Sequence, residues 1–119
     1  MNNLLLDTNI LIYALDENSK FHQKSKNILF NGKYNFFVTS KNISEFFAVC
    51  TKLNLDKDKV WGFYNEIKTN AIILYPSGES IKKFESLIKK HNPFGNRVYD
   101  IEIASIMLAN KVLHIATFN

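Results

Sequence analysis

Three acidic side chains stand where the hydrophobic pattern predicts that strands end and helices begin. Asp7 follows the apolar residues 4–6, Glu45 lies in the helix expected after a second strand, and Asp100 lies in the first turn of the last expected helix. Asn119 follows the last expected strand. In a parallel sheet such positions meet at the carboxyl edge, where ligands bind. Converging carboxylates repel each other unless a cation lies between them, and Mg²⁺ or Mn²⁺ prefers oxygen ligands. The pattern therefore suggests a metal site that could hydrolyse a phosphodiester.

Each of these acids also has an ordinary structural role. Asp7 could cap the helix that follows it, because aspartate is a favoured N-cap residue. Glu45 could form a surface ion pair with Lys41 or Lys52 on its own helix. Asp100 could stabilise its helix through the helix dipole, a role that is compatible with metal binding. The spacing of these residues alone leaves both interpretations open.

Other polar residues near these positions give weaker signals. Glu102 is turned about 200° around the helix from Asp100 on a 3.6-residue period, so we expect it to be a surface residue or a contact at the rim of the site. Arg97, at the end of the loop 91–97, could hold a phosphate or could simply belong to a connection, and the sequence favours neither. The histidines are scattered, which argues against a zinc or histidine-based site: His22, His91 and His114.

The elements that must position the acids alternate along the chain. Alternation of strands and helices predicts an α/β class with a short, mainly parallel sheet flanked by helices. Residues 1–119 are expected to form a single domain. The expected strands are 2–6, 34–39, 71–75 and 113–117. The expected helices are 8–15, 20–30, 58–69, 79–91 and 98–110. One further helix is expected after the second strand, capped by Ser40 and ending before a break at 54–57.

Composition limits the class of protein. The hydrophobic fraction of 46% and charged fraction of 22% are typical of a globular chain. Fifteen Lys and Arg against 11 Asp and Glu give a net charge of +4, which fits an RNA-facing surface without requiring one.

Cys50 is the only cysteine, so we expect it to be a small buried hydrophobic residue. The sequence contains no bilayer-spanning apolar run and no signal peptide, so we expect a cytoplasmic protein that does not enter a membrane.

Four short stretches resemble, in the same order, the PIN domain family and, within it, the VapC-type toxins of bacterial toxin–antitoxin modules. Each stretch is weakly specific by itself, but together they extend over nearly the whole chain on a matching α/β pattern. The stretches are Asp7-Thr8-Asn9-Ile10-Leu11-Ile12, Ser44-Glu45-Phe46, Val98-Tyr99-Asp100-Ile101-Glu102-Ile103-Ala104 and Ala116-Thr117-Phe118-Asn119.

The resemblance implies a three-layer α/β/α fold and a Mg²⁺- or Mn²⁺-dependent endoribonuclease. It implies RNA as the substrate, a cognate antitoxin as the partner, and a homodimer. It also favours metal binding over helix capping for Asp7. The implied catalytic and metal-binding residues are Asp7, Glu45 and Asp100, with Asn119 as a fourth polar position and Thr8 and Thr117 as supporting hydroxyls.

The sequence departs from the family pattern at its end. The pattern usually continues past Thr117-Phe118-Asn119 into an Asp-Phe pair and a further short strand, and nothing follows Asn119 here. A site with one acid fewer is expected to bind a divalent cation less strongly, because affinity rises with ligand charge and number. The alternative function is therefore a non-catalytic PIN-like binding or scaffolding module with an incomplete metal site.

Overall fold

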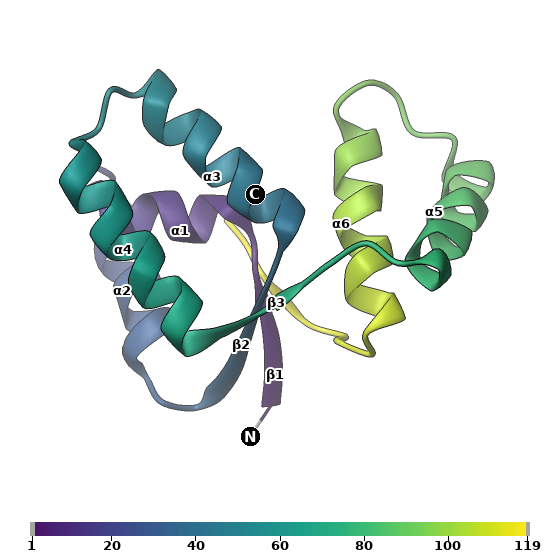
Figure 1. The fold of residues 1–119 in the computed structure, drawn as a ribbon, viewed down its shortest axis with the longest axis horizontal. Helices are drawn as coiled ribbons and strands as arrows, with labels where there is room; N and C mark the ends of the chain where they lie inside the picture. The colour runs from purple at the N-terminus through teal and green to yellow at the C-terminus, as the bar shows by residue number, and fades with distance from the viewer. Residues whose placement is uncertain (1, 119) are drawn as a thin grey trace.

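Strands and helices alternate along the chain, as the hydrophobic pattern predicts. The computed structural model describes residues 2–118. Its elements are β1 (Asn2–Leu6), α1 (Thr8–Leu15), α2 (His22–Phe30), β2 (Tyr34–Thr39), α3 (Ser40–Lys52), α4 (Lys57–Asn70), β3 (Ala71–Leu74), α5 (Gly78–His91), α6 (Arg97–Ala109) and β4 (Ile115–Ala116). The strands form one sheet in the order β3-β2-β1-β4, and each neighbouring pair is parallel. Figure 1 shows this sheet between α1–α4 and the pair α5 and α6, which confirms the α/β/α class.

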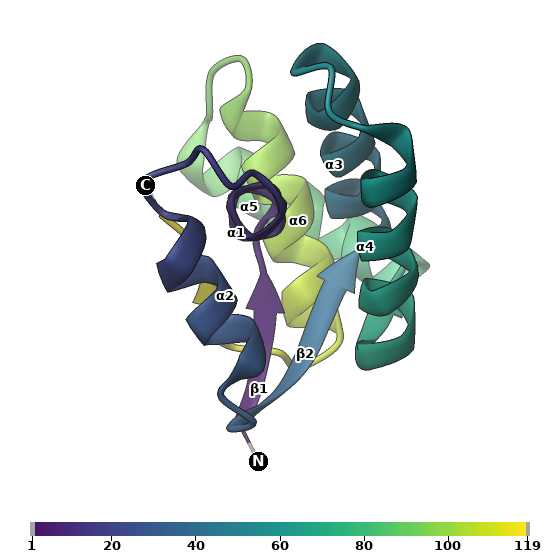
Figure 2. The same ribbon diagram turned by 90° about the vertical axis from the view of Figure 1, so that its left-hand side faces the viewer.

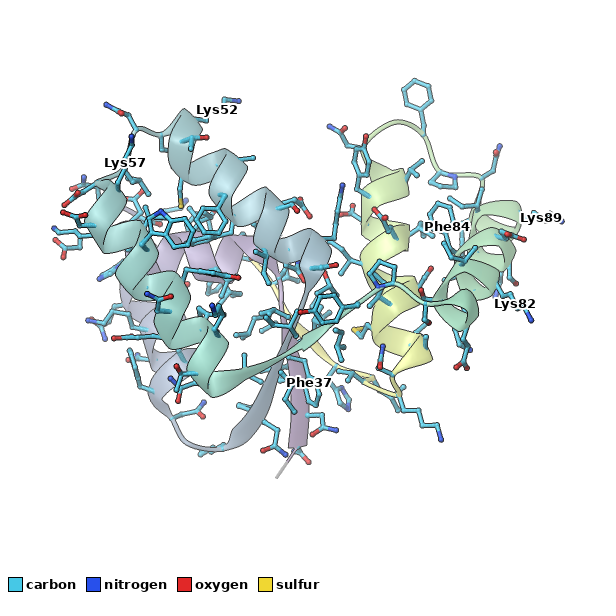
Figure 3. All side chains as sticks on the ribbon, viewed as in Figure 1. Phe37, Lys52, Lys57, Lys82, Phe84 and Lys89 are labelled. Atoms are coloured by element: carbon cyan, nitrogen blue, oxygen red, sulfur yellow. The ribbon has the colours of Figure 1, made fainter. Side chains whose placement is uncertain are left out.

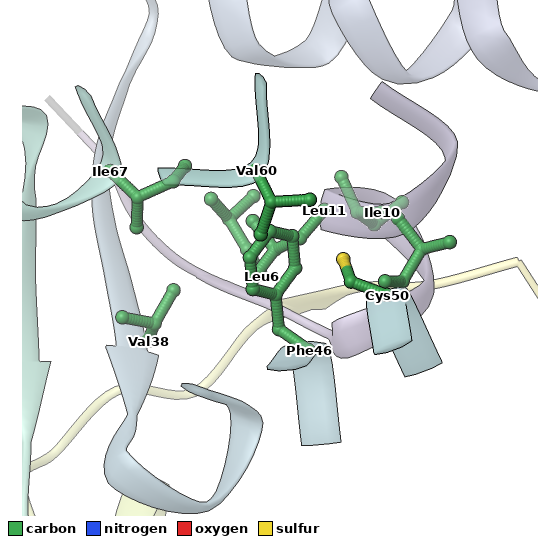
Figure 4. Packing of buried hydrophobic residues seen from close by; sticks show 9 residues of the cluster. Leu6, Ile10, Leu11, Val38, Phe46, Cys50, Val60 and Ile67 are labelled. Atoms are coloured by element: carbon green, nitrogen blue, oxygen red, sulfur yellow. The ribbon is translucent and has the colours of Figure 1, made fainter. Parts of the chain in front are cut away.

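Neighbouring leucines in β1 pack on opposite faces of the sheet. Leu6 lies in a hydrophobic cluster with Ile10 of α1, Val38 of β2 and Phe46 of α3 (Figure 4). Leu5 lies in a second cluster, whose other buried members include Ile103 of α6. Successive side chains of a strand point to opposite faces, so β1 needs helices on both sides to bury its apolar run. This is the physical basis of the three layers.

The carboxyl ends of the central strands lie at one end of the sheet. In Figure 2 the arrowheads of β1 and β2 point the same way, toward the end where α1 and α3 begin. Their parallel register pairs Leu5 with Phe37, and β2 continues to Thr39 before α3 starts. The residues that follow these strands are therefore brought to a common edge.

Several element boundaries differ from the sequence expectation. The last strand, expected over 113–117, is only the two residues Ile115–Ala116, because it pairs solely with Leu5 and Leu6 at the end of β1. The second helix begins at residue 22 instead of 20. A side-chain turn, in which the Phe21 N–H donates to Ser19 Oγ, delays its start. The other helices, and the strand that ends at Leu74, lie within one residue of the expected ranges. The expectation that Ser40 caps the third helix is wrong: Thr39 is the N-cap, because its side chain accepts from the Asn42 N–H, and Ser40 is the first residue of α3.

Cys50 has the structural role expected of it. Its side chain is buried in the cluster that contains Phe46, and burial raises the pKa of the thiol to about 11. A thiol with such a pKa is almost wholly protonated near neutral pH, so Cys50 packs as a small hydrophobic residue.

None of the helices within residues 2–118 combines the length and the hydropathy that a membrane crossing requires.

Candidate active site

Asp7 lies between the end of β1 and the start of α1, and both of its carboxylate oxygens accept hydrogen bonds. The Thr8 N–H donates to Oδ1 over 2.8 Å, so Asp7 is the N-cap of α1. The Thr117 hydroxyl donates to Oδ2 over 2.7 Å. Each carboxylate oxygen has two lone pairs. The capping role is therefore real, and it leaves lone pairs that could bind a cation. Thr117 was expected to be a supporting hydroxyl. The structure places it against Asp7, and its role at the site stays a prediction.

A buried asparagine connects the starts of α1 and α3. Asn42 is fully buried, and its Nδ2 donates to Thr8 Oγ1 over 3.1 Å. Its Oδ1 accepts from the backbone N–H and the hydroxyl of Thr39, at 3.0 and 2.8 Å, which completes a capping box at the start of α3. The hydroxyl of Thr8, also expected to be a supporting group, thus contacts Asn42, and its role at the site stays a prediction. This brace fixes the helix that carries Glu45 against the helix that Asp7 caps.

Glu45 faces the other acids from the first half of α3. Its Oε1 is shielded from solvent and has no hydrogen-bond partner within residues 2–118. Burial raises the pKa of Glu45, and the negative charges of Asp7, Asp100 and Glu102 raise the pKa further, whereas Lys41 lowers it. These three acids are thus close enough to Glu45 to disfavour its charged form. A buried oxygen without a partner is uncommon in folded proteins.

Asp100 connects two hollows on this edge. One hollow, of about 220 Å³, is lined by Asp7, Asp100 and Thr117 together with apolar residues. The other, of about 430 Å³, is lined by Glu45 and Asp100 among others. Asp100 itself is exposed in the first turn of α6. The structure therefore brings the three predicted acids to the same edge of the sheet.

The three acids do not form a ready-made metal cage. Within the described part of the chain, no three His, Cys, Asp or Glu side chains are grouped closely enough to hold a metal ion. The donor set still fits Mg²⁺ or Mn²⁺ in type, because Mg²⁺ commonly keeps several waters and binds through one or two carboxylates plus substrate phosphates. The unpartnered Oε1 of Glu45 is the observation that supports this fit.

Comparison with known sequences assigns the family. The family profile described as PIN domain matches residues 4–119. The chain belongs to the PIN domain family. Among curated proteins, none matches this PIN domain in sequence.

Solved structures share the fold of this PIN domain. VapC20 of Mycobacterium tuberculosis, described as a sarcin-ricin loop cleaving toxin, has a TM-score of 0.80 at 8% identity, over 98% of this chain and 89% of that chain. VapBC2 of Rickettsia felis, bound to a DNA fragment from its promoter, has a TM-score of 0.71 at 17% identity, over 98% and 88% of the two chains. DNA-bound VapBC of Salmonella typhimurium has a TM-score of 0.64 at 16% identity, over 98% of both chains. At these identities the likeness establishes the fold.

The remaining predicted residues of this PIN domain have different outcomes. Arg97 is exposed and lines the 430 Å³ hollow, and its substrate-binding role stays a prediction. Asn119 lies outside the described residues. Glu102 was expected to be a surface residue or a rim contact, and it lies 3.8 Å from Lys41 at the edge of the acidic group. Within residues 2–118, this ion pair replaces the alternative pairing of Lys41 with Glu45.

Sequence reasoning missed three residues of this PIN domain that shape the site. Asn42 was overlooked, although Thr39 and Asn42 have the spacing of a capping box, which was the signal that could have found it. Lys41 was considered only as a partner of Glu45, although it too follows the end of a strand. Tyr99 lies in one of the stretches that resemble the family, but no local pattern assigns it a role. Its contact with Lys41, 4.3 Å from the ammonium nitrogen to the ring centroid, joins residues distant in sequence.

Proposed function

We propose that this PIN domain is a divalent-metal-dependent endoribonuclease and the toxin of a toxin–antitoxin module. The observation that carries the proposal is the convergence of Asp7, Glu45 and Asp100 at one edge of the sheet, with Oε1 of Glu45 buried and unpartnered. Family membership supports a nuclease. The similar folds support a toxin, since one belongs to a toxin described as cleaving the sarcin-ricin loop and others belong to VapBC complexes.

Asp7, Glu45 and Asp100 would hold the Mg²⁺ or Mn²⁺ ion. The chemistry that such an ion supplies when bound is activation of water and neutralisation of charge on the phosphate. Thr117 and the N–H of Thr8 keep the carboxylate of Asp7 in a fixed orientation. The raised pKa of Glu45 means that its carboxyl group retains a proton to higher pH than an ordinary glutamate, and positive charge at the site favours release of that proton.

The comparisons support one proposed partner of this PIN domain. We propose a cognate antitoxin, because VapBC complexes share the fold. We also propose that the substrate is RNA, that the protein forms a homodimer, and that it acts in the cytoplasm. An assay with the purified antitoxin tests the first of these, because the antitoxin should suppress cleavage.

A second candidate is a non-catalytic PIN-like binding or scaffolding module. One observation favours it: within residues 2–118 the acids do not form a group of three close enough to hold a metal ion. The two functions differ in what Mn²⁺ does. A nuclease should bind Mn²⁺ and cleave RNA only in its presence, whereas a scaffold should bind RNA or protein equally with and without Mn²⁺.

The test is cleavage of a labelled RNA by the purified chain in Mg²⁺, in Mn²⁺ and in EDTA. We expect cleavage with either metal, none in EDTA, and none with Asp100→Asn. Asp58→Asn is a matched control, because Asp58 lies in the first turn of α4 as Asp100 lies in the first turn of α6. Cleavage that survives both EDTA and Asp100→Asn would contradict the proposed site. Mn²⁺ titration that shows no heat would favour the scaffold.

A further inference from the structure

Lys41 is a cationic side chain held inside an otherwise acidic group. It lies in the first turn of α3, next to the end of β2. Its ammonium nitrogen is 4.3 Å from the centroid of the Tyr99 ring and 3.8 Å from Oε1 of Glu102. The side chain of Lys41 is 31% exposed. Two residues of α6 therefore restrain a side chain that is usually mobile.

The ion pair with Glu102 does not account for this placement. A separation of 3.8 Å is too long for a hydrogen bond, so the pair uses none of the three donors of the ammonium group. Both partners are partly exposed, and pairs of this kind contribute little to stability. The contact with Tyr99 is better suited to orient the ammonium group, because a cation over an aromatic face is attracted by the ring quadrupole.

Lys41 belongs to the lining of the larger hollow on this edge. Lys41, Arg97 and Tyr99 line this hollow together with Glu45 and Asp100. Its volume of about 430 Å³ lies in the range of ligand-binding pockets. The lining thus combines two cations with two of the acids proposed to hold the metal. Acids alone would repel a nucleic-acid backbone, so the cations supply the attraction that an approaching phosphate requires.

We infer that Lys41 and Arg97 form a binding site for a backbone phosphate of RNA, and that Tyr99 is the positioning residue that holds Lys41 ready for it. The inference rests on the proposed nuclease function, since the site lies beside the proposed metal ligands. It adds a substrate contact that is distinct from the acids. Arg97 contributes a second cation to the lining of the hollow, from the start of α6.

Binding of a labelled single-stranded RNA in EDTA, followed by fluorescence anisotropy at several salt concentrations, tests this site without cleavage. Lys41→Met should raise Kd about fivefold for any sequence. It should also reduce the slope of log Kd against log salt by about 0.7, the loss expected for one phosphate contact on a single strand. Lys41→Gln serves as a second variant if Lys41→Met does not fold. Lys89→Met is the charge-matched control, because Lys89 is exposed on α5, away from the acidic edge (Figure 3).

Two variants of Tyr99 separate positioning from charge. Tyr99→Phe keeps the ring and should bind RNA like the wild type, whereas Tyr99→Leu removes the ring and should raise Kd nearly as much as Lys41→Met. An unchanged salt slope in Lys41→Met overturns the phosphate site, and wild-type binding by Tyr99→Leu overturns the positioning role. A wild-type protein that binds no RNA also overturns the inference.

These outcomes are distinguishable from failure of the proposed function. If the wild type cleaves RNA in Mn²⁺ but Lys41→Met binds RNA with an unchanged slope, the nuclease stands and the phosphate site fails. If the wild type does not cleave in Mn²⁺ but Lys41→Met loses affinity and slope, the nuclease fails and the phosphate site is supported.

Discussion

Thr117 donates a 2.7 Å hydrogen bond to Oδ2 of Asp7, although the two residues are 110 positions apart in the sequence. Asn9 holds this threonine in place, because its Nδ2 donates to Thr117 Oγ1 and to the carbonyl oxygen of Phe118, both over 3.1 Å. Phe118 in turn stacks on Phe21, with 4.8 Å between ring centroids. The orientation of Asp7 is therefore set by residues from both ends of the described chain.

Replacing this hydroxyl should loosen the carboxylate of Asp7. Thr117→Val removes the donor and keeps the shape of the side chain, so we expect the free energy of unfolding to fall by about 1 kcal/mol and Mn²⁺-dependent cleavage to fall with it. Chemical unfolding and an RNA cleavage assay measure the two effects. Thr117→Ser, which keeps the hydroxyl, should behave like the wild type. Equal activity in Thr117→Val and wild type would show that Asp7 needs no such orientation.

Removing the buried brace should have a larger effect on stability. Asn42→Ala leaves the Thr39 N–H and the Thr8 hydroxyl without their partner, and an unsatisfied buried group costs about 1–3 kcal/mol. We expect thermal unfolding to shift down clearly and cleavage to weaken, since α1 and α3 would no longer be held together. Asn65→Ala, at an exposed position on α4, is the control and should change little. A melting temperature equal to that of the wild type would contradict the brace.

Neutralising the proposed ligands should separate catalysis from folding. Asp100→Asn should abolish cleavage and Mn²⁺ binding, and change the free energy of unfolding by less than about 0.5 kcal/mol, because exposed substitutions usually do. Asp7→Asn should also abolish cleavage, but it loses one of two accepted hydrogen bonds and should lose about 1 kcal/mol of stability. Isothermal titration and thermal unfolding give both quantities. A clear loss of stability in Asp100→Asn would indicate a structural role instead.

The pKa of Glu45 predicts a pH-dependent effect on stability. Because burial and Asp7 raise this pKa above its ordinary value of 4.5, the folded state is penalised wherever Glu45 is ionised. The penalty is full above the raised pKa and vanishes below about 4.5, where both states hold the proton. In EDTA, Glu45→Gln should therefore be more stable than the wild type at pH 7 and no more stable at pH 4.

Melting temperatures of the wild type and Glu45→Gln at both pH values measure this effect. Glu85→Gln, at an exposed position on α5, is the control and should show no such change with pH. Added Mn²⁺ should make the wild type the more stable of the two at pH 7, because only the wild type has the Glu45 carboxylate to bind the cation. If the melting temperatures of Glu45→Gln and wild type differ by the same amount at pH 4 and pH 7, ionisation of Glu45 is not the cause of the difference.

Local patterns were sufficient to predict most of the fold. The apolar runs of β1 and β2 and the apolar spacing that includes Phe46 and Cys50 predict elements that the structure confirms, because each of these patterns depends on burial within one segment. The last strand was predicted too long, since its length is set by the two residues of β1 that remain to pair with it. No local pattern contains that information.

The location of the candidate site could also be predicted from local patterns, but the contacts within it could not. The rule that parallel strands end at a common edge placed Asp7, Glu45 and Asp100 together, and the structure agrees on their location, while their roles stay predictions. The contacts that orient them were not predictable from spacing. Asn42 reaches Thr8 and Lys41 reaches Tyr99 only once the sheet has brought their helices together.

The pairing of β1 with β4 also determines when this edge can be completed during synthesis. A ribosome makes the chain from its amino end, so β1, β2 and β3 emerge before the residues that form β4. A nascent chain can therefore build most of the sheet while Asp7 still lacks the hydroxyl of Thr117. Translation thus delays the assembled site until the last described residues have left the ribosome.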